Sequence, residues 1–302
     1  MTEKMKRSLK DKLILKNSLV KEALSEFLGT FIMIALGCGS IAQSVLSRGE
    51  MGGAPVISLG FAMAVTIAIY VSGGVSGGHI NPAVSFAMCL TGKMRWVKFP
   101  IYVIAQFLGA FVGAVAVFAI NYDLLMFYTG GEFTVTGVNK TAHIFATYPE
   151  EYLSLTNGFA DQVMSTAILV LGVFAIFDTD NLAVPKGLEP IAIGLLIILL
   201  TSSMARNSGC AMNPARDLSP RFFTYIAGWG PEVFTAGYQW WWVPIAGPMV
   251  GAAVGAAVYM LFIELHHAPV QPRQSKATHD KYELTNMEEE MQLQRGCPPP
   301  TL

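Results

Sequence analysis

The chain has 302 residues, of which 53% are hydrophobic and only 14% are charged. Soluble domains carry about 25% charged residues, so this composition excludes an ordinary soluble protein and indicates an integral membrane protein. The net charge of −1 gives no sign of a nucleic-acid partner. The four cysteines include no CxxC pair, which excludes a disulfide framework and a cysteine zinc site.

Six stretches are predicted to cross the membrane, because each approaches the roughly 20 apolar residues that a spanning helix needs. Hydrophobicity does not alternate along them, which argues against a transmembrane barrel. The predicted fold class is therefore all-α and transmembrane. The predicted spans cover residues 24–45, 56–75, 100–121, 157–177, 190–205 and 241–263.

Basic residues set the expected orientation. Residues 1–21 are polar and basic, which does not match a secretory signal, and further basic residues precede the third span at Lys93, Arg95 and Lys98. By the positive-inside rule both regions are cytoplasmic, and an even number of spans returns the C-terminus to the same side. We therefore expect a basic cytoplasmic arm over 1–21, a channel domain over 22–265 and a disordered cytoplasmic tail over 266–302.

Two stretches, 76–92 and 207–223, fit no span. Each contains Asn-Pro-Ala, and Asn at a cap followed by Pro at the first helical position marks a helix start. An ordinary surface loop is the alternative, but a loop would not turn apolar again for about two further turns. Each stretch is therefore predicted to dip into the membrane and to return as a half-helix. The motifs are Asn81, Pro82 and Ala83, and Asn213, Pro214 and Ala215.

The chain repeats itself around these motifs. Each half, about 22–121 and about 157–265, has three spans with the dip between the second and the third. Because three is odd, the halves must be inverted copies, so their half-helices enter from opposite faces and meet near the midplane. Two Gly-xxx-Gly pairs are expected where the halves pack against each other, with contacts between subunits as the alternative. They are Gly109 with Gly113, and Gly251 with Gly255.

The meeting point offers hydrogen-bond donors and a positive field. Two helix N-termini and two asparagine amides can bind a water or hydroxyl oxygen there, while they repel cations and disfavour proton conduction. Irregular backbone at membrane depth is tolerated where it lines a cavity, so the carbonyl groups before each half-helix should line one. The residues concerned are Gly77, Gly78, His79, Asn207, Ser208 and Gly209.

Charged residues within the membrane are costly and need water or partners. Arg216 is expected to face the pathway, with a structural pair to an acid such as Asp217 as the alternative; Asp217 itself is expected to be structural. Glu26 and Asp161 are expected to accept hydrogen bonds from the dipping backbone, with proton coupling as the alternative. His79 has no second histidine or carboxylate beside it, so neither a metal site nor a cofactor is expected.

The paired Asn-Pro-Ala motifs in inverted halves, with Arg216 after the second, resemble the aquaporin family over about residues 20–265. Asp217, Arg221 and the pair Pro244-Ile245 are similar to the glycerol-conducting branch of that family, the aquaglyceroporins. The resemblance implies six spanning helices, two re-entrant half-helices and a homotetramer in the lipid bilayer.

The resemblance also implies a narrow filter near the outer mouth. Carried over by position, the filter consists of Phe61, Thr201, Cys210 and Arg216. Thr201 stands where water-selective members carry His, and Cys210 where a bacterial-type glycerol channel carries Phe, so a wide opening is expected. Arg206 departs from the uncharged family pattern; it either points to the outer vestibule or disturbs the approach to the filter.

The resulting prediction is a passive channel for water, glycerol and other small uncharged solutes, urea among the candidates, that excludes ions and protons. It is expected in the plasma membrane with both termini cytoplasmic. A secondary transporter is the alternative, because inverted repeats and broken helices also occur there; a membrane enzyme has no catalytic motif to support it. Asn139 begins a glycosylation sequon in the connection that this topology places outside, and an unused sequon is the alternative.

Overall fold

The computed structural model describes residues 14–267, which form helices, turns and irregular segments with no strand among them. Six helices in this part of the chain are long and apolar enough to cross a membrane, as predicted. The chain divides after Leu265, and the predicted tail, apart from His266 and His267, lies outside the described residues, as does the arm before residue 14. The spanning helices are α2 (Ser18–Leu46), α3 (Ala54–Ser76), α5 (Phe99–Ile120), α7 (Leu155–Phe177), α8 (Glu189–Ser208) and α11 (Val243–Phe262).

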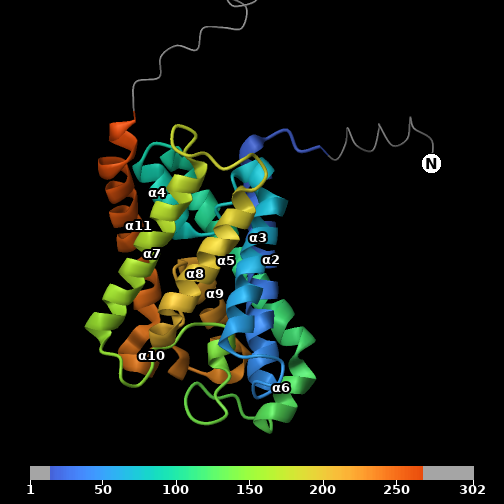
Figure 1. The fold of residues 1–302 in the computed structure, drawn as a ribbon. Coiled ribbons are helices and arrows are strands. Elements are labelled where there is room, and N and C mark those ends of the chain that lie inside the picture. Colours follow the sequence, from blue (N-terminus) through green and yellow to red (C-terminus); the bar gives the residue numbers. More distant parts are fainter. Residues whose placement is uncertain (1–13, 268–302) are drawn as a thin grey trace, which may run out of the picture. The chain divides into compact units, whose positions relative to one another are not determined.

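The first spanning helix begins earlier than its apolar stretch. The side chain of Asn17 caps α2 by accepting hydrogen bonds from the backbone N–H groups of Leu19 and Val20. Capping satisfies donors that the first helical turn otherwise leaves free, so the polar residues at the start of α2 are helical too. α2 begins and α11 ends at the same end of the bundle, which we call the terminal side (Figure 1).

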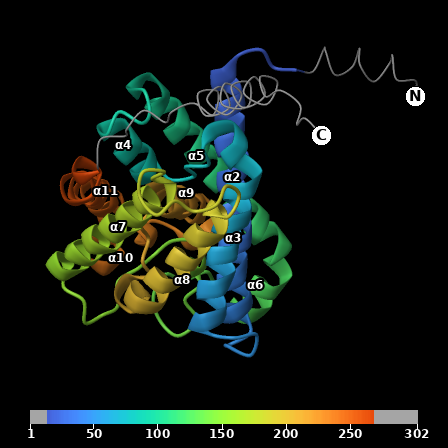
Figure 2. The same cartoon turned by 45° about the horizontal axis from the view of Figure 1, so that its top comes forward.

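Two short half-helices, α4 (Pro82–Leu90) and α9 (Pro214–Thr224), interrupt the pattern of spans as predicted. Each starts at an Asn-Pro pair: the side chain of Asn81 accepts a hydrogen bond from the N–H of Ala83, and that of Asn213 accepts from Ala215. Figure 2, which tilts the terminal side forward, shows α9 surrounded by the long helices. The sequence pattern of cap followed by proline therefore located both re-entrant elements correctly.

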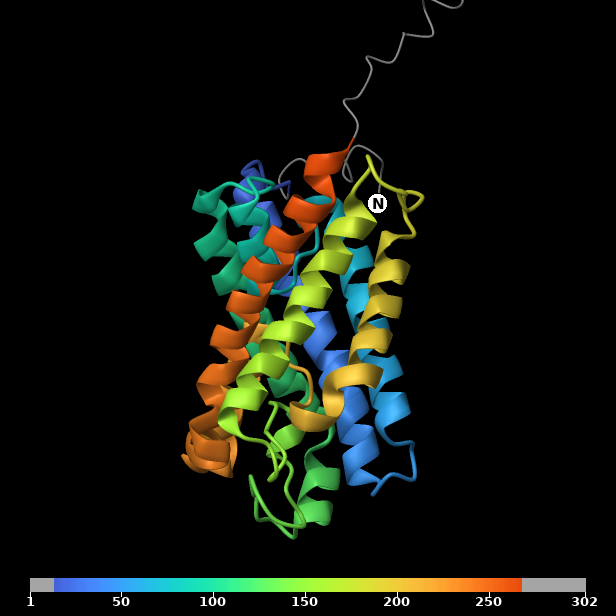
Figure 3. The same cartoon turned by 60° about the vertical axis from the view of Figure 1, so that its left-hand side comes forward.

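The two halves make corresponding contacts, as an inverted repeat requires. In the first half α2 packs against α3 and α5, and in the second half α7 packs against α8 and α11. Figure 3 shows α7 and α11 side by side along most of their lengths. Each half-helix crosses to the other half, because α4 packs against α11 and α9 packs against α5. This exchange brings the two Asn-Pro-Ala motifs into one place.

The glycine pairs lie within the halves, and the prediction that they join the halves was wrong. A Cβ atom at Gly109 in α5 would lie 2.2 Å from the carbonyl oxygen of Phe27 in α2. At Gly255 in α11 it would lie 2.3 Å from the carbonyl oxygen of Ala167 in α7. These glycines therefore allow the first and third spans of each half to approach backbone to backbone.

Most of the short elements that the sequence pattern did not predict lie at the end of the bundle opposite the terminal side, which we call the loop side. Figure 1 shows α6 and α10 there, at the bottom of the view. They belong to the connections that follow α5 and α9. The short elements at the two ends of the bundle are η1 (Trp96–Lys98), α6 (Tyr122–Thr129), η2 (Ala142–Ile144), η3 (Tyr225–Trp229), α10 (Glu232–Gln239), η4 (Trp240–Trp242) and η5 (Glu264–His266).

Candidate functional site

A cavity of about 650 Å³ lies between the two halves. On the loop side its wall includes Lys140, Glu150 and Arg206, and toward the terminal side it includes Gly77 and Phe177. Side chains from α3, α7 and α8 form much of the wall, together with the segments that precede the two half-helices. The cavity therefore follows the bundle from one end toward the other.

The two Asn-Pro-Ala motifs meet beside this cavity. Nδ2 of Asn81 donates to the carbonyl oxygen of Met212 at 2.9 Å, and Nδ2 of Asn213 donates to the carbonyl oxygen of Ile80 at 2.9 Å. These reciprocal bonds join the start of each half-helix to the segment before the other. Asn81 and Asn213 border the cavity. The prolines and alanines of the motifs are buried and do not border it; they are Pro82, Ala83, Pro214 and Ala215.

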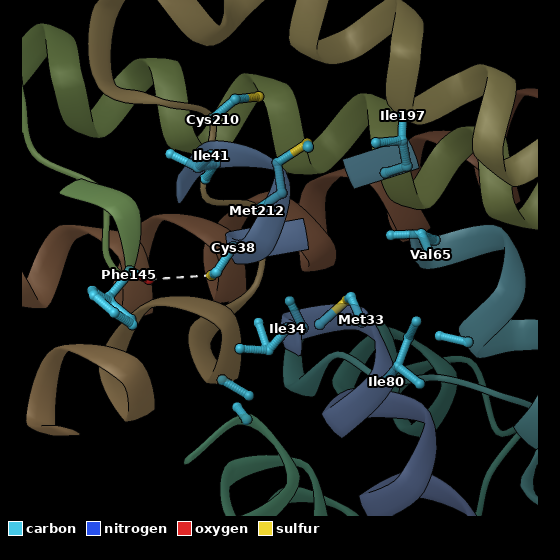
Figure 4. Packing of buried hydrophobic residues seen from close by; sticks show 14 of the residues in the cluster. Met33, Ile34, Cys38, Ile41, Val65, Ile80, Phe145, Ile197, Cys210 and Met212 are labelled. Atoms are coloured by element: carbon cyan, nitrogen blue, oxygen red, sulfur yellow. Dashed lines mark hydrogen bonds between the residues drawn. The ribbon is translucent and has the colours of Figure 1, made fainter. Parts of the chain in front are cut away.

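The backbone before the half-helices is strained. Ile80, Cys210 and Met212 have φ angles of 45°, 52° and 50°, a left-handed conformation that costs a residue with a side chain about 1–2 kcal/mol. Such strain persists only where the surroundings determine it, and here the asparagine amides hold the carbonyls of Ile80 and Met212. The strained turns aim these segments into the bundle interior, where Figure 4 shows Ile80 and Met212 among buried side chains.

Five of the six predicted backbone positions line the cavity. They are Gly77, Gly78 and His79 before α4, and Ser208 and Gly209 before α9. Asn207 is the exception to that prediction. Its carbonyl oxygen accepts from the N–H of Glu150 at 3.0 Å, and its side chain accepts from the hydroxyl of Tyr152 at 3.1 Å. These two bonds turn Asn207 toward the 150–152 connection on the loop side.

Glu26 collects donors from the first dipping segment. Its carboxylate is fully buried and accepts from the N–H of His79 at 2.9 Å and the N–H of Ile80 at 2.7 Å. The hydroxyl of Ser76 and Nε2 of Gln106 also donate to it, at 2.6 and 2.8 Å. A buried carboxylate needs such partners, and the donors of irregular backbone need an acceptor.

The second half solves the same problem differently. Asp161 is only half-buried and accepts from the hydroxyl of Ser208 at 2.9 Å. The next residue, Gln162, is fully buried; its Oε1 accepts from the N–H of Met212 at 3.3 Å, and its Nε2 donates to Ser208 at 2.8 Å. Gln162 thus contacts the dipping backbone directly, a residue that the sequence analysis did not select. The sequence feature that could have identified Gln162 is its position as a polar residue within an apolar span.

The four residues of the predicted filter all border the same cavity. The guanidinium group of Arg216 lies 5.0 Å from the ring centroid of Phe61, and its NH1 donates to the carbonyl oxygen of Phe145 at 2.8 Å. The hydroxyl of Thr201 donates to the carbonyl of Ile197 in its own helix at 2.8 Å. Because the hydroxyl donates its hydrogen within the helix, its oxygen can still accept a hydrogen bond from a molecule in the cavity.

Cys210 lies beside the cavity, but its thiol is in contact with the hydroxyl of Ser165 in α7. Figure 4 shows the sulfur of Cys210 directed toward that helix. The residue is 4% exposed. The backbone of Cys210 and the small volume of its side chain, more than its thiol, therefore shape the cavity wall.

Asp217 has its ion pair with Arg221 at 2.8 Å, with both side chains fully buried. Arg216 donates to a backbone carbonyl instead. The alternative of an ion pair between Arg216 and Asp217 is therefore wrong, because Asp217 pairs with Arg221. Arg206 is 81% exposed and pairs with Glu150 at 3.2 Å on the loop side. It therefore lies at the mouth of the cavity and not at the filter residues.

His143 also lies at this mouth, in the connection between α6 and α7. Burial and the charge of Lys140 lower the pKa of His143 to about 4. The imidazole is therefore neutral at physiological pH and adds no charge beside Lys140 and Arg206. Asn139, in the same connection, is exposed.

Comparison with known proteins gives one consistent result. The sequence pattern of the family described as Major intrinsic protein matches residues 14–259. Human Aquaporin-9 is 63% identical over 283 residues, which cover 92% of this chain and 96% of that protein. Human Aquaporin-10 is 53% identical over 253 residues, 84% of each chain. The X-ray structure of the aquaglyceroporin from Plasmodium falciparum matches with a TM-score of 0.73 at 32% identity, covering 80% of this chain and 95% of that one.

Proposed function

Because this chain belongs to the aquaporin family of major intrinsic proteins, we propose that it is a passive membrane channel, and not an enzyme, that conducts water, glycerol and other small uncharged solutes. The solute gradient drives the flux, and the protein contributes selectivity without coupling chemistry. The relatives that share more than half of its sequence carry aquaporin names, and the matching solved structure is an aquaglyceroporin.

The observation that carries the proposal is the meeting of two half-helix N-termini beside one continuous cavity. Each asparagine amide has two N–H groups, and the carbonyl bonds of Asn81 and Asn213 use one of them. The second N–H of Asn81 can donate to a passing water or hydroxyl oxygen, and that of Asn213 can do so from beside Sδ of Met33, which lies 3.9 Å from its Nδ2. The positive ends of α4 and α9 make the same place unfavourable for cations and protons.

The proposed filter consists of Phe61, Thr201, Cys210 and Arg216. The ring of Phe61 offers an apolar surface to the carbon chain of a polyol, and the N–H groups of Arg216 that remain free donate to its hydroxyls. Thr201 is smaller than the histidine of water-selective members, which leaves room for glycerol. The carbonyls along Gly77–His79 and Ser208–Gly209 supply acceptors, so a polyol exchanges its hydration water for polar groups on one side of the pathway.

The membrane setting is a further part of the proposal. We place the protein in the plasma membrane as a homotetramer, with the terminal side in the cytoplasm and the loop side outside. Lys93, Arg95 and Lys98 support this orientation, because they lie on the terminal side, between α4 and α5, and basic residues favour the cytoplasm. Asn139 is exposed on the loop side and is available for glycosylation.

Reconstitution of the purified protein in liposomes tests this function. Glycerol influx and water efflux are measured by stopped-flow light scattering, with and without sodium and proton gradients. A channel gives glycerol flux that is proportional to the glycerol gradient and independent of the ion gradients. Saturation at modest glycerol concentration together with a dependence on an ion gradient would favour a secondary transporter, and chemical turnover of the solute would favour an enzyme.

A further inference from the structure

The carbonyl group of Phe145 is the hydrogen-bond acceptor of Arg216, the arginine of the proposed filter. It accepts the hydrogen bond from NH1 of Arg216 at 2.8 Å, and the thiol of Cys38 lies 3.8 Å from the same oxygen (Figure 4). Phe145 belongs to the connection between α6 and α7, outside both half-helices. Connections of this kind are usually mobile, yet this one supplies the acceptor for a buried charge that must keep one position.

We propose that Thr147, together with the buried pair of Asp217 and Arg221, acts as a set of positioning residues that fixes Phe145 and through it Arg216. The inference rests on the proposed channel function and adds that selectivity depends on residues that need not touch the solute. The segment from Thr141 to Thr147, which we call the clamp segment, is held at two points by independent interactions.

The first anchor is polar and joins the clamp segment to α9. Oδ2 of Asp217 accepts from the N–H of Thr147 at 2.7 Å and from its hydroxyl at 2.5 Å. The guanidinium group of Arg221 donates to Oδ1 of Asp217 through Nε at 3.0 Å and NH2 at 2.8 Å. NH2 of Arg221 also donates to the carbonyl of Thr147, and NH1 donates to the carbonyl of Val233 at 2.7 Å.

This anchor is rigid because its charges are buried. Asp217 and Arg221 are both 0% exposed and lie one turn apart on α9. A buried ion pair with every partner in place has few alternative arrangements, since any shift leaves a charge without a partner. Asp217 is also the residue directly after Arg216. The same half-helix therefore carries the filter arginine and holds the segment that provides its acceptor.

The second anchor combines ring contacts of Phe145 itself with a hydrogen bond to Thr141, at the other end of the clamp segment. The ring of Phe145 lies 5.7 Å from that of Phe223 and 5.5 Å from that of Trp229. Nε1 of Trp229 donates to the hydroxyl of Thr141 at 3.1 Å. With Thr141 and Thr147 both tied to the region after Arg216, the carbonyl of Phe145 between them has little freedom to move.

Release of the clamp segment has a directional consequence. If Phe145 moves away, the guanidinium group of Arg216 loses an acceptor, and its remaining free space is the cavity. An arginine side chain that extends into the cavity narrows it. Because glycerol is wider than water, glycerol flux should fall by the larger factor.

Thr147→Val is the test, since valine keeps the size and the backbone N–H but removes the hydroxyl, which donates to Asp217 and accepts from Nε1 of Trp240 at 3.5 Å. Each variant is reconstituted in liposomes, and glycerol and water permeability are measured on the same preparation. Their ratio does not depend on how many channels fold. Loss of one hydrogen bond to a charged group shifts a conformational equilibrium by roughly tenfold or more, and since the backbone bond remains, we expect the ratio to fall about fivefold.

Two further variants make the result specific. Thr147→Ser keeps the hydroxyl and should restore the wild-type ratio. Thr129→Val is the matched control, because Thr129 is also a buried threonine but its hydroxyl contacts no residue of the filter: it donates to the carbonyl of Leu125 at 2.8 Å and accepts from the N–H of Gly131 at 3.2 Å. The ratio of this variant should equal that of the wild type. If Thr147→Val does not fold, Trp229→Phe, which keeps an aromatic ring but removes the hydrogen bond to Thr141, should lower the ratio in the same direction.

The outcomes separate the two proposals. A wild-type protein that carries no glycerol would refute the channel function itself. A wild type that conducts, with folded Thr147→Val and Trp229→Phe variants that keep the wild-type ratio, would leave the channel function intact and refute the clamp. A fall in the ratio that Thr147→Ser does not reverse would also refute it, because the hydroxyl would then not be the cause.

Discussion

In the proposed filter, Thr201 is a residue at which side-chain size should affect selectivity directly. Its hydroxyl is bound within α8, to the carbonyl of Ile197, so the residue contributes little volume to a cavity that it borders. In Thr201→His, an imidazole would project from the same position toward Phe61 and Arg216. We expect glycerol permeability to fall by a larger factor than water permeability, because the wider solute is excluded first.

The measurement is the ratio of the two permeabilities in liposomes, with Thr201→Ser as the control. Serine keeps the hydroxyl and is slightly smaller, so its ratio should not fall. If Thr201→His lowers both fluxes equally at normal protein incorporation, Thr201 does not lie at the constriction and the proposed filter is wrong at this position.

Glu26 is a second residue whose replacement has a definite sign. Its two oxygens accept four hydrogen bonds, two of them from the backbone of the first dipping segment. Glu26→Gln replaces one oxygen by an NH2 group, which would face a donor. At least one buried donor then has no acceptor, which should lower the free energy of unfolding by about 2 kcal/mol or more. The measurement is the thermal unfolding temperature in detergent, which should fall.

Asp161→Asn is the matched control for Glu26→Gln. Asp161 is half-buried and accepts from the hydroxyl of Ser208 and from the side chain of Asn207, and neither donor belongs to the backbone of a dipping segment. Asp161→Asn should therefore lower the thermal unfolding temperature clearly less than Glu26→Gln does. Equal losses at both positions would contradict the assignment of the main support to Glu26 in the first half and to Gln162 in the second.

Some of these roles could be predicted from the sequence and others could not. The roles of Asn81 and Asn213 could be predicted, because asparagine caps helices and proline favours the first helical position. The acceptors of their side-chain amides could not be predicted. These acceptors are the backbone carbonyls of Ile80 and Met212, and every residue has a carbonyl. The same holds for Phe145. Backbone acceptors leave no mark in the sequence, so only the fold identifies them.

At the scale of elements, the glycines of α5 and α11 set how closely helices approach. A Cβ atom at Gly109 would lie 2.2 Å from a backbone oxygen of α2, which no side-chain movement can relieve. Gly109→Ala should therefore separate α2 from α5 and cost about 1–3 kcal/mol, measured by thermal unfolding in detergent. Gly74→Ala is the control, because no atom lies within 4 Å of a Cβ there.

Gly74 lies in the last turn of α3, where alanine is the better helix former by roughly 1 kcal/mol. Its replacement should be neutral or slightly stabilising. Equal destabilisation by Gly109→Ala and Gly74→Ala would show that backbone flexibility, and not close approach, explains the glycines.

The number of spans and the half-helix positions were predictable because they depend on apolar runs and on caps, which are local. The partner of each Gly-xxx-Gly pair was not, because spacing indicates a close contact but not the element that makes it. Our expectation that Gly109 and Gly251 join the halves failed for this reason. The short helices α6 and α10 were also missed: each has eight residues, too few for a clear periodic pattern.

At the scale of the whole molecule, the fold requires that the two ends of the bundle face different compartments. α2 begins and α11 ends on the terminal side, and the connection that contains Asn139 lies on the loop side. The exposed part of that connection around Val138 and Asn139 offers a protease an accessible backbone. Basic residues on the terminal side favour the cytoplasm for that side.

We therefore expect that protease added to sealed, right-side-out cells cuts near Asn139 and spares tags at both termini. Permeabilised cells should lose the terminal tags as well, which shows that they are cleavable when reached. Asn139→Gln tests the sequon in the same cells: an electrophoretic shift in the variant means that the wild type carries a glycan there, which only the outer side of the membrane allows. Cleavage of the N-terminal tag in sealed cells would reverse the orientation, and the filter beside Arg216 would then lie at the inner mouth of the channel.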